Sequence, residues 1–243
     1  MRWVISIVIA IAILLPSVSV GEVKTKSNLW NWSADAKHHQ AVVQVEVDNA
    51  RGTGILIRVD EDKPVGRGFE GYCLTAYHVI EKDKERRVIR VTYSDGSVAK
   101  RCRVVRSDRE SDVAIVHVWV PPNTRPVEMA KVAVRPGDQI EFAGLGGTIE
   151  LECCLRHFSA KAAAPTSSDE IFADATLLPG DSGGPVFNSQ QHVVGVISGG
   201  WIWWDGGQKT EAGQVIRTTW PARAANADAI RKLLEGDLSI ARK

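Results

Sequence analysis

A serine surrounded by glycines is the first feature of the sequence that could carry chemistry. Residues 177–187 read LLPGDSGGPVF and place Ser182 between Gly180 and the pair Gly183 and Gly184. Because glycine lacks a Cβ, backbone N–H groups here can turn towards a ligand that a side chain would block. A hydroxyl beside converging amide donors is what acyl transfer requires. A tight turn between strands would use the same residue types, so the rest of the chain must distinguish the two interpretations.

A nucleophilic serine needs a base that takes its proton and a carboxylate that orients the base. Among the six histidines, His78 is the candidate base, because the stretch YCLTAYHVI carries it from an apolar strand directly into a turn. Asp112 is the candidate carboxylate, since it stands at the start of the apolar strand in SDRESDVAIVHV. The other histidines are interpreted as structural residues: His38, His39, His117, His157 and His192.

Short strands dominate the pattern of the chain. Apolar residues alternate with polar ones in runs such as Val43, Val45 and Val47, and turn residues such as SDGS separate the runs. The expected strands cover 43–47, 55–57, 71–76, 89–93, 101–105, 113–120, 139–143, 149–155, 185–187, 192–198 and 213–219. This pattern predicts an all-β fold of the barrel or sandwich type.

Two further segments organise these strands. The Pro-rich stretch VPPNTRP at 120–126 divides them into two comparable sets. Near the end of the sequence, apolar residues of AANADAIRKLLEG (224–236) recur at helical spacing, and Gly236 supplies a stop. We therefore expect a C-terminal helix after two sets of strands.

The first 21 residues differ in composition from all that follow. Arg2 precedes an apolar run that ends at Leu15, after which come a proline and small residues. This order is typical of a secretory signal peptide, with cleavage after Ser19 or Gly21. An uncleaved membrane anchor that extends to Val20 is the alternative. We expect an exported protein, periplasmic or secreted.

The composition is that of an ordinary globular domain. The formal net charge is +1, and 44% of the residues are hydrophobic, which argues against disorder and against a nucleic-acid footprint. Cysteine usage is consistent with an oxidising compartment but too sparse for a dense disulfide framework. Three pairings can be drawn among the four cysteines, and the sequence leaves the choice open: Cys73, Cys102, Cys153 and Cys154.

In order along the chain, the motifs resemble chymotrypsin-fold serine peptidases, and most closely the protease domain of the HtrA/Deg family. The stretches that carry the resemblance are GTGILI (52–57), YCLTAYHVI (72–80), VTYSDGS (91–97), RVVRSDRESDVAIVHV (103–118), GDQIEFAGLGG (137–147), ADATLLPGDSGGPVF (173–187) and VVGVIS (193–198). The chain order of histidine, aspartate and serine also disfavours an α/β-hydrolase, in which the acid and the histidine follow the serine.

The resemblance implies two six-stranded antiparallel Greek-key barrels with the active site between them. The expected divisions are a signal peptide (1–21), an N-terminal extension (22–40), a first barrel (41–120), a connector (121–136) and a second barrel with the C-terminal helix (137–243).

The resemblance also implies a role for each site residue. His78 would be the general base, Asp112 its orienting partner and Ser182 the nucleophile of a serine endopeptidase. The N–H groups of Gly180 and Ser182 would form the oxyanion hole. No cofactor and no metal are expected. A catalytically latent or inactive peptidase-fold binding protein is the alternative.

In this fold, the pocket for the residue before the cleaved bond lies between two chain segments. Here these walls would contain Thr176, Leu177, Leu178 and Pro179 on one side and Ser198, Gly199 and Gly200 on the other. Neither wall is charged, so we expect cleavage after small or medium aliphatic residues in unfolded or extended segments. Asp205 is the one nearby residue that could introduce a charge from outside these walls.

Two features set this chain apart from the family pattern, and its tryptophans raise further expectations. Asp181 stands where the family usually has asparagine, and no partner for its charge is evident. HtrA proteins usually continue into PDZ domains, and substrate delivery through such domains is not expected here. The tryptophan-rich loop at 201–204 could contact substrate, a membrane surface or another subunit, although simple packing is equally plausible. Trp30 and Trp32 lie in the region through which HtrA proteases trimerise, so a homotrimer is a further expectation.

Overall fold

The computed structural model describes residues 37–48, 50–81, 88–146, 155–164, 166–175, 177–202 and 219–235. The expected signal peptide (1–21), Cys153 and Cys154, and residues 203–204 of the tryptophan-rich loop lie outside these ranges. Within the described part, no helix is both long enough and apolar enough to cross a membrane.

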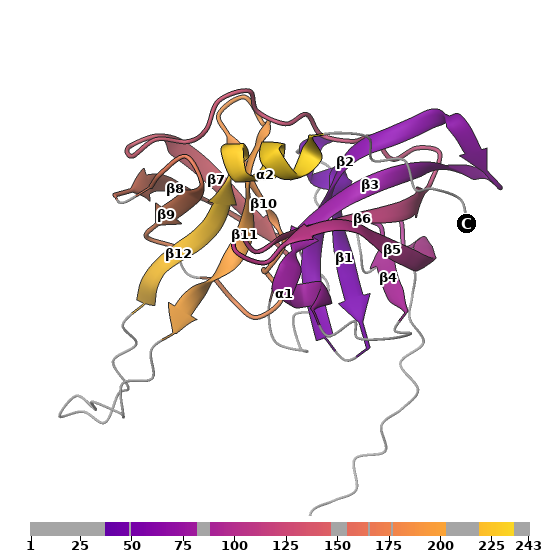
Figure 1. The fold of residues 1–243 in the computed structure, drawn as a ribbon, viewed down its shortest axis with the longest axis horizontal. Coiled ribbons are helices and arrows are strands. Elements are labelled where there is room, and N and C mark those ends of the chain that lie inside the picture. The colour runs from indigo at the N-terminus through magenta and orange to yellow at the C-terminus, as the bar shows by residue number, and fades with distance from the viewer. Residues whose placement is uncertain are drawn as a thin grey trace, which may run out of the picture.

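The first half of the chain forms a closed antiparallel barrel, drawn in indigo and magenta in Figure 1. Around the barrel the strands follow the order β1-β2-β3-β6-β5-β4, so that β3 pairs with β6 across a longer connection. The strands are β1 (Val42–Val47), β2 (Ala50–Val65), β3 (Gly68–Ala76), β4 (Ile89–Thr92), β5 (Val98–Asp108) and β6 (Val113–Val120).

The second half repeats this topology in a second closed barrel. Its order around the barrel, β7-β8-β9-β12-β11-β10, corresponds strand for strand to that of the first barrel. The strands are β7 (Gln139–Gly144), β8 (Arg156–Ala163), β9 (Glu170–Ala173), β10 (Pro185–Asn188), β11 (Val193–Ile202) and β12 (Thr219–Asn226). The expected all-β fold of two six-stranded antiparallel barrels is confirmed.

The strand positions in the second barrel differ from the sequence expectation. β9 was not expected from the sequence, and the strand expected at 149–155 lies outside the described residues apart from Leu155, after which β8 starts at Arg156. The predicted C-terminal helix is confirmed: its apolar positions run from Ala227 to Leu234, as does the observed helix, whereas residues up to Asn226 belong to β12. β12 contains a proline and three alanines, which favour strands poorly, but its pairing with β9 and β11 overrides that preference.

Three short helical segments complete the fold. A 3-10 helix, η1 (Lys37–Ala41), leads into β1, and α1 (Tyr77–Ile80) follows β3. The C-terminal helix α2 (Ala227–Leu234) lies across the two barrels in Figure 1. Asn226 caps α2, since its side-chain oxygen accepts a hydrogen bond from the Ala227 N–H at 2.8 Å. The same oxygen accepts from the Val134 N–H at 3.0 Å, so the cap also ties the inter-barrel connector to the helix.

Each barrel has its own apolar interior. One cluster of buried residues fills the first barrel and includes Ile230 of α2, and a smaller cluster fills the second barrel around Phe142. Cys73 and Cys102 are buried in the first cluster as free thiols. Burial raises the pKa of both thiols, that of Cys102 to about 12. Both cysteines therefore stay protonated and unreactive in the folded chain.

The same substitution at a buried and at an exposed valine tests this account of the core. Val116 is fully buried in β6, whereas Val132 is 63% exposed. We expect Val116→Ala to lower the free energy of unfolding by about 2–3 kcal/mol, because it removes two packed methyl groups. Val132→Ala should change it by no more than about 0.5 kcal/mol. Urea denaturation followed by circular dichroism measures both, and equal effects would contradict the assignment of the core.

Candidate active site

Asp112 forms two hydrogen bonds with His78 and a third with the neighbouring Tyr77. His78 lies on α1, directly after β3, and Asp112 lies in the turn before β6 with φ of 54°. The His78 Nδ1 is 2.8 Å from Oδ2 of Asp112, and the His78 backbone N–H donates to Oδ1 at 2.9 Å. The Asp112 carbonyl accepts from the Tyr77 N–H at 3.1 Å. The carboxylate thus fixes the position of the imidazole ring and points one of its nitrogens away from Asp112.

The environment of Asp112 keeps its side chain ionised. Burial alone would raise the pKa of Asp112, but hydrogen bonds from His78 and Ser198 outweigh burial and lower the pKa below the usual range. The Ser198 hydroxyl donates to Oδ2 of Asp112 at 2.5 Å. Sequence reasoning placed Ser198 only in a substrate wall and did not identify this contact, because the two residues are 86 positions apart.

The glycines around Ser182 adopt conformations that other residues rarely take. Gly180 and Gly183 have φ of 102° and 85°. A Cβ on Gly183 would lie 2.1 Å from the Thr53 carbonyl oxygen, so the turn also needs the missing side chain. Among the described residues, no group accepts a hydrogen bond from the amide N–H of Gly180 or Ser182. Within the described part of the chain, both amides can therefore donate to a ligand.

Thr53 of the first barrel attaches to the serine loop of the second. Its N–H donates to the Ser182 carbonyl at 2.8 Å, and its hydroxyl donates to the Gly180 carbonyl at 2.7 Å. The same hydroxyl accepts from the Leu145 N–H at 2.9 Å. Thr53 is fully buried, so these bonds are shielded from water. They hold the two barrels in register where their site residues meet.

Asp181, next to the serine, is buried and paired with a cation. Its side chain is 2% exposed, and its Oδ2 lies 2.5 Å from Nη1 of Arg156 at the start of β8. The N–H groups of Gly146 and Leu178 donate to the carboxylate at 2.7 and 2.8 Å. The partner that the sequence did not reveal is therefore Arg156. The Asp181 carboxylate is thus held by Arg156, Gly146 and Leu178. These contacts restrict the movement of the loop that carries Ser182.

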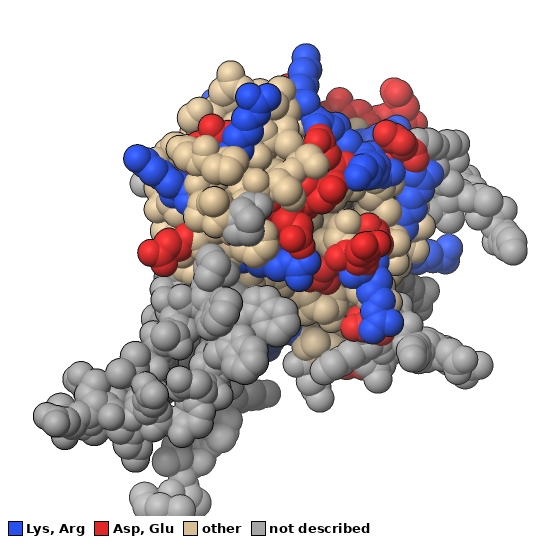
Figure 2. Space-filling model, turned by 60° about the vertical axis from the view of Figure 1, so that its left-hand side comes forward, with Lys and Arg blue, Asp and Glu red and all other residues tan. Residues whose placement is uncertain are grey.

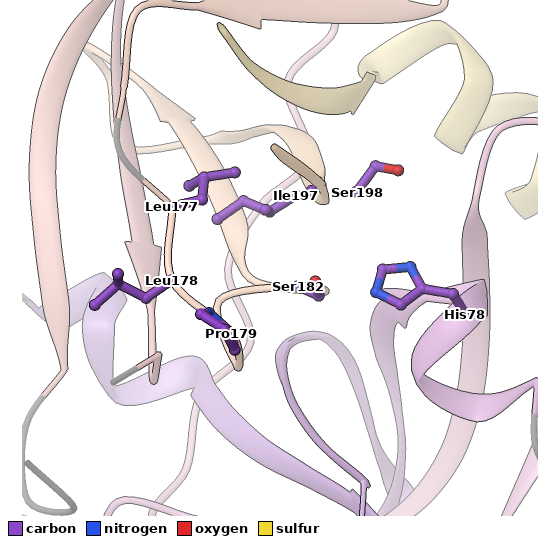
Figure 3. A pocket seen from close by; sticks show the side chains of 8 residues that line it. His78, Leu177, Leu178, Pro179, Ser182, Ile197 and Ser198 are labelled. Carbon is purple, nitrogen blue, oxygen red and sulfur yellow. The ribbon is translucent and has the colours of Figure 1, made fainter. Parts of the chain in front are cut away.

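A cavity of about 290 Å³ opens beside Ser182 and His78. In Figure 3 the His78 ring faces Ser182, and apolar side chains extend along the other side of the pocket. The cavity is lined by His78, Leu177, Leu178, Pro179, Ser182, Ile197, Ser198 and Gly199.

Most residues of the expected substrate walls line this cavity. Leu177, Leu178, Ser198 and Gly199 all contribute to it. Ile197 is an additional lining residue that the sequence analysis did not assign. Thr176 and Asp205 lie outside the described residues, and Gly200 pairs with Ala222 in the sheet and is not part of the lining.

The fold and these motifs have matches among known proteins. A family model described as "Trypsin-like peptidase domain" matches residues 52–196, which is more than half of the chain. The chain belongs to the trypsin-like peptidase family. Its relatives within that family are proteases of the HtrA/DegP type.

Two of these relatives are curated proteins. "Protease Do-like 1, chloroplastic" of Arabidopsis thaliana is 31% identical over 145 residues, which cover 54% of this chain and 32% of that protein. "Periplasmic serine endoprotease DegP" of Escherichia coli K12 is 30% identical over 152 residues, which cover 60% of this chain and 29% of that protein. The match therefore spans about a third of the length of these relatives.

A solved structure supports the fold. A serine endoprotease from Yersinia pestis superimposes with a TM-score of 0.58 over 88% of this chain and 67% of that chain, at 20% sequence identity.

The face of the molecule in Figure 2 carries acidic and basic side chains in alternation, without a large area of one sign.

Removing Arg156 should leave a buried charge without a partner. We expect Arg156→Met to lower the free energy of unfolding by about 3–5 kcal/mol, since the Asp181 carboxylate would stay buried and unpaired. In an Asp181→Asn background the same change should cost much less, because no buried charge remains. Urea denaturation of the single and double variants measures the difference.

Arg125→Met is the matched control for this prediction. Its guanidinium is 69% exposed and pairs with Glu61 at the surface, so its loss should cost no more than about 1 kcal/mol. Equal effects of Arg156→Met and Arg125→Met would contradict the role assigned to the buried pair.

Proposed function

We propose that the chain is a serine endopeptidase in which Ser182 is the nucleophile, His78 the general base and Asp112 the residue that orients His78. The observation that carries the proposal is the His78–Asp112 pair, with Nδ1 and Oδ2 2.8 Å apart. His78 and Ser182 line the same cavity. Because Asp112 engages Nδ1, the other ring nitrogen is left to take the proton of the serine hydroxyl.

The reaction would proceed through an acyl-enzyme. As His78 removes its proton, the Ser182 oxygen attacks the peptide carbonyl, and His78 then gives the proton to the departing amine. Asp112 remains ionised beside the imidazolium, consistent with its lowered pKa. The free N–H groups of Gly180 and Ser182 would donate to the oxyanion. A water molecule, activated by His78, then releases the acyl group.

The cavity supports a preference for aliphatic residues before the cleaved bond. Its described lining is neutral apart from the titratable His78 and includes Leu177, Leu178 and Ile197. A lysine or arginine side chain would lose hydration there without an acidic partner among the described residues, whereas an aliphatic one gains apolar contact. Extended or unfolded segments fit best, because they can add to a strand edge by backbone hydrogen bonds.

Export and assembly also form part of the proposal. The apolar segment before Pro16 is typical of a signal peptide, and one relative is named as periplasmic. We infer that the mature chain starts near Val20 or Glu22 and acts outside the cytoplasm on protein substrates. Trimerisation, as in HtrA proteases, is inferred from the resemblance alone. N-terminal sequencing and light scattering of the exported protein test these two inferences.

Substitution of the three proposed catalytic residues tests the mechanism. Ser182→Ala, His78→Ala and the double variant should each lose nearly all hydrolysis of an unfolded casein substrate, and the double variant should be scarcely worse than either single one. Asp112→Asn should lower kcat by about 10⁴-fold, since the amide no longer holds the required imidazole tautomer. His192→Ala, at a histidine paired with Glu128 and absent from the cavity lining, is the matched control. Substantial activity in purified Ser182→Ala would refute the mechanism.

A peptide library tests the specificity. We expect most cuts, identified by mass spectrometry, to follow Val, Ile, Leu or Ala. Leu177→Asp should shift the preference towards Lys and Arg, because it places a carboxylate in the cavity wall. A dominant preference of the unmodified chain for Lys or Arg would contradict the aliphatic assignment.

A further inference from the structure

Three histidines and one glutamate gather outside the candidate active site. His38 and His39 belong to η1, Glu141 to β7 and His157 to β8. The Nε2 atoms of His39 and His38 lie 2.7 and 3.7 Å from Oε1 of Glu141. The Nδ1 of His157 lies 3.7 Å from the same oxygen. Three imidazole rings therefore direct a nitrogen at one carboxylate oxygen.

The strand register explains why these residues meet. In the β7–β8 ladder Glu141 pairs with Ser159 and Ala143 pairs with His157. Glu141 and His157 are therefore diagonal neighbours on one face of the sheet. The 3-10 helix η1 packs on this face, and the rings of His39 and His157 are 4.7 Å apart. The cluster joins the segment that enters the first barrel to two strands of the second.

His38 is buried in a way that leaves its polar atoms unused. The residue is 8% exposed, and neither ring nitrogen has a hydrogen-bond partner among the described residues. Its ring packs edge-on against Phe187, with centroids 4.6 Å apart. Burial of an imidazole without a partner is costly.

We propose that His38, His39 and Glu141 bind one divalent transition-metal ion, that the exposed ring of His157 turns in as the fourth ligand, and that Zn²⁺ fits the site best. The ligand atoms of the first three residues all lie within 4.8 Å of one another, and zinc takes imidazole nitrogens and a carboxylate oxygen in tetrahedral geometry. Bonds of about 2.0–2.2 Å place such ligand atoms roughly 3.3–3.6 Å apart, and the distances of 2.7 to 3.7 Å to Glu141 bracket this spacing. Calcium and magnesium would prefer an all-oxygen site.

This site is structural in character and separate from the candidate active site. Four protein ligands would complete the coordination, with no position left for a substrate. The His157 side chain is 52% exposed and gives the ion a path from solvent. The bound ion would supply the partner that the buried ring of His38 lacks, and it would fasten η1 to β7 and β8.

Isothermal titration calorimetry with ZnCl₂ tests the proposal directly. The sample is the His78→Ala variant, from which metal is removed with EDTA followed by dialysis. This substitution removes the His78–Asp112 pair, which could also bind zinc. We expect one Zn²⁺ per chain with a dissociation constant of about 1 µM or below, and a higher melting temperature with zinc present. Co²⁺ in place of Zn²⁺ should give the visible absorption of a tetrahedral site.

Two matched pairs of variants locate the site. His157→Ala and Glu141→Gln change partly exposed ligands and should each weaken zinc binding by at least about tenfold. His192→Ala and Glu128→Gln change the same residue types in a pair outside the cluster, 3.6 Å apart, and should leave binding unchanged. Circular dichroism without metal checks that all four variants fold. Absence of stoichiometric binding, or equal effects of the two pairs, would overturn the proposal.

Discussion

The buried carboxylate of Asp181 is the constraint on which the geometry around Ser182 depends. A charge that is 2% exposed must be paired and hydrogen-bonded, and Arg156, Gly146 and Leu178 supply those partners. Each partner comes from a different segment of the second barrel, so the neutralisation of one charge fixes three segments at once. Thr53 then connects this loop to the first barrel, on whose strand ends His78 and Asp112 lie.

Much of the fold and of the candidate site could be predicted from local sequence. Glycines at 180 and 183 mark positive φ values, and alternating valines mark the strands of the first barrel, because both signals come from the residue itself. The partner of Asp181 could not be predicted in this way. Arg156 lies 25 residues away, and their contact depends on how β8 packs in the second barrel, which local periodicity does not give. The hydrogen bond from Thr53 to Gly180, 127 positions away, could not be predicted from local sequence either.

The histidine cluster could not be predicted from local sequence either. His38 and His39 were interpreted as structural residues of a polar extension, and no metal was expected. In the structure both are buried, and they meet Glu141 and His157 from distant parts of the chain. Adjacent histidines in a polar stretch carry no signal of their own, because only the packing of η1 on β7 and β8 brings these histidines and Glu141 together. Strand alternation puts Arg156 and His157 on opposite faces of β8, so one strand supports both the serine loop and the cluster.

Labelling with a fluorophosphonate tests the central claim, that Ser182 is an activated nucleophile, most directly. The purified chain is incubated with the probe at neutral pH, and the modified residue is identified by mass spectrometry of its peptides. The account predicts stoichiometric modification at Ser182, and loss of this modification in His78→Ala. The absence of labelling, or labelling that persists without His78, would contradict it and favour a binding protein on a peptidase fold.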